Sequence, residues 1–190
     1  MAVNYQLELE RELQKNEGKT PRLLLHCCCA PCSSYVLEYL SPHFSITAHY
    51  YNPNIDTPEE YAHRARELSR FVQEMPLPGA VDVLAEPYTP AEFYAAVKGL
   101  EDVPEGGRRC YECYRLRLRR AAQAAAAGGY DYFTTTLSIS PHKNAVWLGE
   151  LGEAFAAEYG VRWLPSDFKK KNGFKRSTEL AARYGLYRCL

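Results

Sequence analysis

The sequence predicts an α/β fold with an open, mostly parallel sheet and helices on both faces, of the Rossmann-like type. Short apolar runs bounded by turn residues alternate with longer segments in which apolar residues recur at helical spacing. The most unusual polar segments follow directly after predicted strands, where parallel sheets bind their ligands. A length of 190 residues with 46% hydrophobic content suits a single globular domain with a sizeable core.

The expected elements follow in order along the chain. Residues 3–15 place leucines at helical spacing among glutamates, and a polar segment around Gly18 and Pro21 ends this first helix. Pro31 suits the first turn of the next helix, where its missing N–H costs nothing, and Gly128 ends a later one. Strands are expected over 22–26, 44–50, 81–85 and 130–136. Helices are expected over 31–40, 58–74, 90–97, 110–127, 141–159 and 177–184.

Two parts are expected, a helical extension over residues 1–20 and the Rossmann-like domain over 21–190. Lysine plus arginine and aspartate plus glutamate each number 23, so the net charge favours no partner. No run approaches the roughly 18 apolar residues that span a bilayer, and the first residues are polar, unlike a signal peptide. We therefore expect a cytoplasmic protein without a membrane partner, in which thiols stay reduced.

Six of the seven cysteines are concentrated in two segments, one after the first predicted strand and one at the start of helix 110–127. They are Cys27, Cys28, Cys29, Cys32, Cys110 and Cys113. Thiolates are soft ligands for iron–sulfur clusters and zinc, and two converging clusters favour a metal site over a redox dithiol or inert packing. Since four thiolates suffice for structural zinc, the surplus favours an iron–sulfur cluster, alone or beside a second metal.

Several polar residues near strand ends have more than one interpretation. His142 and Lys143, at the start of a predicted helix, suit proton donation and phosphate binding equally well. Asp167 suits metal ligation, orientation of Lys169 or helix capping. His26, at a strand end, is expected to be a hydrogen-bonded core residue rather than a catalytic acid.

Six motifs occur together and in one order. They are His26-Cys-Cys-Cys-Ala-Pro-Cys32, Tyr50-Tyr-Asn-Pro-Asn-Ile55, Arg109-Cys-x-x-Cys113, Phe133-Thr-Thr-Thr-Leu137, Ser140-Pro-His-Lys143 and Asp167-Phe-Lys-Lys170. From about Arg22 to the C-terminus, the chain thereby resembles the QueH family of epoxyqueuosine reductases. The resemblance implies a HUP-like domain that reduces the epoxide of epoxyqueuosine in tRNA to queuosine without cobalamin. It also implies a 4Fe-4S cluster and a neighbouring metal ion, iron or zinc, that shares its thiolate ligands.

The family pattern also assigns roles to individual cysteines. It places metal ligands on Cys28, Cys29, Cys32, Cys110 and Cys113. Cys27 falls at a variable position, where packing is expected, and the partition of ligands between the two metals stays open. Similar sequences continue into a cysteine-rich tail, so Cys189 is either a remnant of that tail or an ordinary terminal thiol.

The implied partners are a tRNA anticodon stem-loop bearing epoxyqueuosine and an external electron donor of the ferredoxin or flavodoxin type. Candidates to bind the modified base are Tyr51, Asn52 and Asn54, although Asn-Pro-Asn is also an ordinary turn. Candidates to stack on an unpaired base are Tyr111, Tyr114 and Phe174. Candidates for phosphate contacts are Arg109, Arg115, Arg117, Arg119, Lys169 and Arg176. A solvated helix face is the alternative for the arginines of helix 110–127.

Two other functions stay open at this point. A nucleotide-activating tRNA thiolation enzyme has a similar fold, but it needs a glycine-rich phosphate loop, and residues 27–32 contain no glycine. A non-catalytic zinc-binding RNA module is the second alternative. Metal analysis separates it from a reductase, because bound zinc is colourless and has no redox chemistry.

Overall fold

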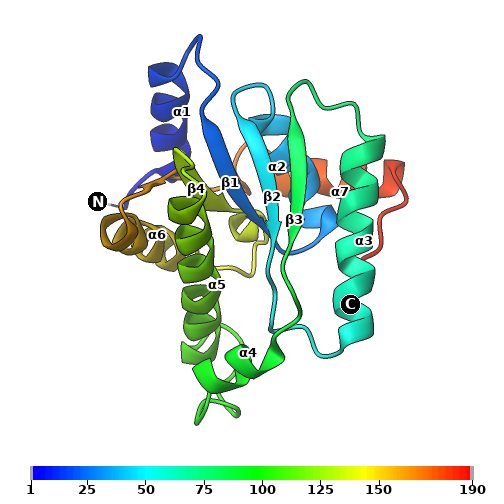
Figure 1. Ribbon diagram of the computed structural model, residues 1–190, viewed down its shortest axis with the longest axis vertical. Coiled ribbons are helices and arrows are strands. Elements are labelled where there is room, and N and C mark those ends of the chain that lie inside the picture. The colour runs from blue at the N-terminus through cyan, green and yellow to red at the C-terminus, as the bar shows by residue number, and fades with distance from the viewer. Residues whose placement is uncertain (1, 189–190) are drawn as a thin grey trace.

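A computed structural model describes residues 2–188, and it contains a five-stranded sheet in the order β3-β2-β1-β4-β5. Its strands are β1 (Arg22–Cys27), β2 (Ser45–Tyr50), β3 (Val81–Ala85), β4 (Tyr132–Thr135) and β5 (Arg162–Trp163). Every neighbouring pair of strands is parallel. The predicted open α/β fold is therefore confirmed, and Figure 1 shows helices on both sides of the sheet.

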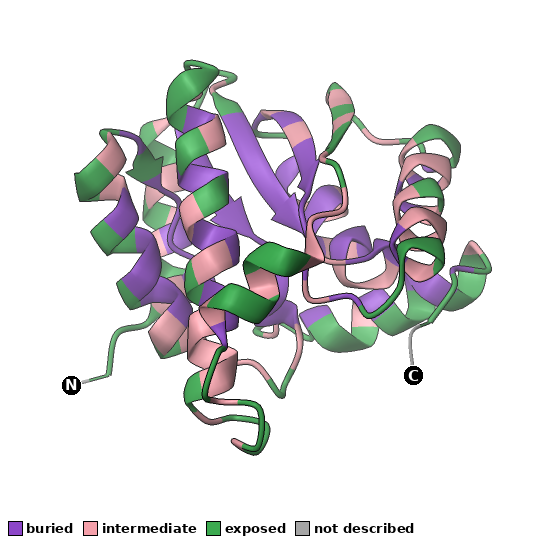
Figure 2. Ribbon diagram, turned by 60° about the horizontal axis from the view of Figure 1, so that its bottom comes forward, coloured by how far each residue is buried: buried purple, intermediate pink, exposed green. Residues whose placement is uncertain are grey.

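The helices divide between the two faces of the sheet. One face carries α1 (Tyr5–Lys15), α2 (Ala30–Leu40), α3 (Pro58–Glu74) and α7 (Gly173–Arg183). The opposite face carries α5 (Arg108–Ala127) and α6 (Ala145–Tyr159), while the short α4 (Pro90–Ala96) contacts α5. Each face has its own hydrophobic core, and Figure 2 shows the strands buried between helices whose outer sides are exposed.

The central strand β1 divides its side chains between the two cores. Leu23, Leu25 and Cys27 belong to the core under α2, α3 and α7, whereas Leu24 belongs to the core under α5 and α6. Successive side chains of a strand point to opposite faces, so His26 shares the α5 face with Leu24. At the end of β1, the side chains of the neighbouring residues His26 and Cys27 therefore lie on opposite faces of the sheet.

Two helix starts differ by four residues from the sequence-based expectations, and one strand is additional. The helix expected from residue 141 begins at Ala145, because Asn144 caps it by accepting the N–H of Trp147 at 3.1 Å. The helix expected from residue 177 begins at Gly173, where a Cβ would lie 1.8 Å from the carbonyl oxygen of Phe168. Strand β5 was not expected, since two residues are too short to show an alternating pattern.

The first helix packs on the hydrophobic core beneath α2, α3 and α7. Leu9 of α1 is fully buried in the core beneath α2, and Gln6 donates a hydrogen bond to the hydroxyl of Tyr39 at 3.2 Å. Within residues 2–188, no helix combines the length and apolar character that crossing a membrane requires. The expected division into residues 1–20 and 21–190 stays a prediction.

Candidate metal centre

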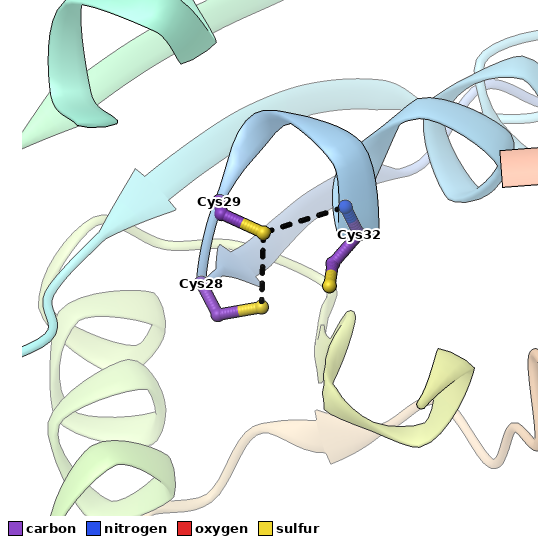
Figure 3. Close-up of side chains that lie close together, drawn as sticks. All are labelled: Cys28, Cys29 and Cys32. Atoms are coloured by element: carbon purple, nitrogen blue, oxygen red, sulfur yellow. Dashed lines mark hydrogen bonds between the residues drawn. The ribbon is translucent and has the colours of Figure 1, made fainter. Parts of the chain in front are cut away.

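Three cysteines converge where β1 ends and α2 begins. Cys29 is the N-cap of α2, and its sulfur accepts the N–H of Cys32 at 3.5 Å. The sulfurs of Cys28 and Cys29 are 4.0 Å apart, and all three Sγ atoms lie within 4.8 Å of one another. Figure 3 shows the three sulfurs around one common space. The geometry therefore offers a metal ion three soft ligands on one loop.

The surroundings of Cys28 favour the thiolate that a metal needs. Hydrogen bonds with Cys29 and Cys32 hold the pKa of the Cys28 thiol well below its usual range, against the opposing effect of burial. The hydroxyl of Thr136, 3.6 Å from the Cys28 sulfur, and the positive charge of Arg117 lower this pKa further. Cys28, Cys29 and Cys32 could thus hold a metal ion, which agrees with their predicted role as ligands.

Cys27 has the environment of a packing residue, as expected. It is fully buried on the opposite face of the sheet from α5, and its thiol donates to the carbonyl of Leu25 at 3.4 Å. Burial raises the pKa of this thiol to about 12, so the thiolate is disfavoured. The alternation along β1 thus separates Cys27 from the group formed by its neighbour Cys28.

The second cysteine pair lies on the first two turns of α5. Cys110 and Cys113 line a cavity of about 340 Å³. Cys28, Cys29 and Cys32 line a second cavity of about 440 Å³. Lys143 lines both cavities, so the two cysteine groups adjoin the same side chain. Among the described residues, however, Cys28, Cys29 and Cys32 form the only group of three or more potential ligands whose ligand atoms all lie within 4.8 Å of one another. The assignment of Cys110 and Cys113 as ligands therefore stays a prediction.

The segment after β2 contains both engaged and available polar groups. The hydroxyl of Tyr51 donates to Glu92, and the amide of Asn52 is held by internal hydrogen bonds on both sides, with 1% of the residue exposed. The Oδ1 atom of Asn54 is buried and has no hydrogen-bond partner among residues 2–188, yet Asn54 lines the cavity of Cys110. Of the three residues predicted to bind the base, Asn54 has the most suitable environment.

The predicted basic residues do not gather at one place. Arg109 lines the cavity of Cys110, although it also donates to the carbonyl of Glu101 at 3.0 Å. Lys169 forms an ion pair with Asp167 at 2.8 Å, which matches the role of orienting Lys169 that was considered for Asp167. The helix-capping role considered for Asp167 is wrong, because Asn172 is the N-cap of α7. Arg176 pairs with Glu38 and Glu179. Neither Asp167, Lys169 nor Arg176 lines either cysteine cavity.

His142 and Lys143 lie in the turn before α6, close to the helix start where they were expected. His142 is exposed, its backbone N–H bonds to the hydroxyl of Ser140, and it lines neither cavity. The ammonium of Lys143 lies 5.9 Å from the centre of the Tyr114 ring, within cation–π range. The structure therefore places Lys143, rather than His142, beside the cysteines.

The arginines of α5 point in different directions. Arg115 is exposed near Glu112, and Arg119 pairs with Glu158 on α6, but Arg117 is 4% exposed. Residues two apart on a helix do not share a face. Because Arg117 is buried, the expectation that all three arginines meet phosphates is wrong for this residue. A phosphate contact by Arg115 or Arg119 stays a prediction.

Two buried histidines lie on the same face as Arg117. His26 donates from Nε2 to the carbonyl of Tyr51 and accepts at Nδ1 from Thr135, each at 2.9 Å, and burial is the main reason that its pKa falls to about 3. This confirms the expected core role. His49 lies 3.2 Å from Glu86; burial alone would raise the pKa of Glu86, but His49 and Arg120 hold it at about 2.

The sequence placed Thr136 in a motif without assigning it a role, and it did not predict the partners of Asn52. Thr136 follows β4, which pairs with β1, and its backbone N–H donates to the carbonyl of His26 at 2.9 Å. The pairing of β4 with β1 brings the hydroxyl of Thr136 close to the sulfur of Cys28. The contact could have been predicted from the sequence, because the carboxyl ends of paired parallel strands lie side by side. Cys189 was singled out in the sequence and lies outside the described residues.

The fold and the three thiols define a class of protein: a Rossmann-like α/β protein with a group of thiols at the carboxyl edge of its sheet that could hold a soft metal ion. The family model described as "Epoxyqueuosine reductase QueH" matches residues 23–189. The chain therefore belongs to the QueH family of epoxyqueuosine reductases, which are oxidoreductases.

Curated relatives and a solved structure agree with this placement. An epoxyqueuosine reductase QueH of Streptococcus pyogenes is 41% identical, covering 98% of this chain and 74% of that protein. The epoxyqueuosine reductase QueH of Staphylococcus epidermidis is 40% identical, and the alignment covers 98% of this chain and 81% of that protein. A crystal structure described as a predicted tRNA methyltransferase subunit of Methanocaldococcus jannaschii covers 84% of this chain and 74% of that one, with a TM-score of 0.53 and 11% identity. This last likeness supports the fold alone.

Proposed function

We propose that this protein reduces the epoxide of epoxyqueuosine in tRNA to queuosine without cobalamin. The observation that carries the proposal is the convergence of Cys28, Cys29 and Cys32 at the sheet edge of a QueH family member. The reaction consumes two electrons and two protons, breaks both C–O bonds of the epoxide and releases its oxygen as water. A redox centre, a proton donor and a substrate pocket are therefore required side by side.

The proposed ligand set is Cys28, Cys29, Cys32, Cys110 and Cys113, which would hold a 4Fe-4S cluster and a neighbouring iron or zinc ion. Lys143 lines the cavities of both cysteine groups, which supports one shared centre. When bound, the cluster would supply electrons singly, and the neighbouring ion would act as a Lewis acid on the epoxide oxygen. The electrons would come from an external donor of the ferredoxin or flavodoxin type.

The two cavities offer complementary surfaces to a modified base. The cavity of Cys110 is lined by Arg109 and by Asn54, whose buried Oδ1 has no hydrogen-bond partner among residues 2–188. The cavity of Cys28 includes Phe174, whose residue is 50% exposed and which can stack on an unpaired anticodon base. We infer that the base and its cyclopentane substituent bind across these cavities, and that the anticodon stem-loop lies outside them. An enzyme of tRNA that needs reduced thiols would work in the cytoplasm.

Lys143 is the proton donor that the geometry supports best. It lines both cavities and carries transferable protons, whereas His142 lines neither. Phosphate binding is the competing role of Lys143, and kinetics separate the two. Loss of a proton donor slows the reaction even with RNA saturating, while loss of a phosphate contact is overcome by more RNA.

The test is conversion of epoxyqueuosine in a tRNA anticodon stem-loop by protein prepared without oxygen, with a chemical or flavodoxin-type reductant. Queuosine is expected to form without cobalamin or ATP, and Cys27→Ser is expected to retain this activity. An ATP requirement would favour the thiolation-like alternative. A colourless protein that holds zinc alone, binds the RNA and leaves the epoxide intact would favour the binding module.

A further inference from the structure

Arg117 is a buried cation that lacks a carboxylate partner within the described part of the chain. The residue is 4% exposed, and it lies one turn after Cys113 on α5. The ion pairs of the other arginines on this helix involve Arg108, Arg115, Arg119 and Arg120, and none involves Arg117. Burying an uncompensated charge is costly, so a cation at this position requires negative charge nearby.

Two hydrogen bonds of Arg117 connect the two cysteine segments. Its Nε donates to the carbonyl of Cys113 at 3.4 Å, and one terminal nitrogen donates to Oδ1 of Asn52 at 3.4 Å. Asn52 in turn donates through Nδ2 to the carbonyl of Cys27 at 2.9 Å. The chain of contacts from Cys27 through Asn52 and Arg117 to Cys113, here called the bracket, joins the end of β1 to α5.

The charge of Arg117 faces the cysteines rather than solvent. Arg117 lines the cavity that also contains Cys110 and Cys113. Its hydrogen bonds end on the backbone of Cys113 and on Asn52, which itself bonds to the carbonyl of Cys27. Negative charge on the cysteine sulfurs would therefore provide the compensation that no described carboxylate provides.

We propose that Arg117 is a positioning residue that holds the two cysteine segments in register through Asn52 and supplies the countercharge of the thiolate centre. The inference rests on the metal centre proposed above. Reduction makes a thiolate-bound centre more negative, so a nearby positive charge stabilises the reduced form and raises the reduction potential. Arg117 would thus make the centre easier to reduce without ligating the metal.

The test compares the midpoint potential and the iron content of iron-loaded variants. Arg117→Gln removes the charge, Arg117→Lys keeps it, and Arg119→Gln is the matched control two residues away on the same helix. Arg117→Gln is expected to lower the potential by about 59 mV, a tenfold change for a one-electron step, while Arg119→Gln leaves it unchanged. Arg117→Lys is expected to restore most of the potential. Asn52→Leu keeps the charge but cuts the bracket, so it should lose iron to a chelator several-fold faster at a nearly unchanged potential.

Equal potentials in Arg117→Gln and Arg119→Gln would overturn the countercharge role. The countercharge role would also be overturned if Arg117→Lys lowered the midpoint potential as much as Arg117→Gln does. Iron loss in both Arg117 variants would overturn it as well. Iron loss in Arg117→Gln with iron retained in Arg117→Lys would support it. The proposed function is judged separately on the unaltered protein, by its iron and sulfide content and its conversion of epoxyqueuosine.

Discussion

Cys27 and Cys28 are adjacent, yet their replacement by serine should have opposite consequences. Cys27 is fully buried, and its sulfur donates to the carbonyl of Leu25 at 3.4 Å. Burying a hydroxyl in its place should cost roughly 1–3 kcal/mol of unfolding free energy, or about 2–4 °C in Tm for each kcal/mol in a chain of this length. Cys28→Ser should cost less stability in the metal-free protein, since Cys28 is only partly buried, but it removes a soft ligand.

The assay for this pair is thermal unfolding of the metal-free variants together with iron and sulfide content after anaerobic loading. Cys27→Ser is expected to melt at lower temperature with normal iron, and Cys28→Ser is expected to lose or alter the metal centre. Normal iron in Cys28→Ser combined with iron loss in Cys27→Ser would contradict the assignment of Cys28 as a ligand and of Cys27 as a packing residue. That result would mean that the ligand frame is displaced by one residue.

Three further predictions concern kinetics, recognition and pH. Lys143→Ala should slow single-turnover reduction by roughly 10²–10⁴-fold at saturating RNA, with His142→Ala as the control; equal rates in the two variants would exclude Lys143 as the proton donor. Asn54→Leu should raise KM about tenfold without lowering Tm, because Oδ1 has no hydrogen-bond partner to lose within residues 2–188; an unchanged KM would leave Asn54 outside recognition. The pKa of Glu86 falls from 4.5 to about 2 on folding, so its stabilisation is complete above pH 4.5 and is lost as the pH falls through 2. Melts of metal-free Glu86→Gln should lack this part of the acid loss, and an unchanged pH profile would contradict the assignment.

Local patterns were sufficient for most of the fold. The apolar runs of β1 and β2 and the helical spacing of α3 predicted elements that the structure confirms within a residue or two. Boundaries set by single contacts were harder to predict. Asn144 shortens the front of α6 through one capping hydrogen bond, and β5 exists only through its pairing with β4.

The candidate site was predictable where neighbours in sequence are neighbours in space. Cys28, Cys29 and Cys32 belong to one loop, so their spacing sufficed to predict a shared metal site. The role of Asn52 depends on Arg117, which is 65 residues away in sequence. No local pattern distinguishes this buried arginine from its exposed neighbours, because only the packing of α5 on the sheet buries it.

We propose that both cysteine segments hold one iron centre at the sheet edge. The most direct measurement is a crystal structure of the anaerobically prepared protein, with anomalous scattering recorded at the iron and zinc absorption edges. Iron is expected between the loop of Cys28, Cys29 and Cys32 and the first turns of α5, with sulfur ligands from Cys110 and Cys113. Iron bound by the loop alone, with the α5 cysteines free, or zinc as the sole metal at this place, would contradict it.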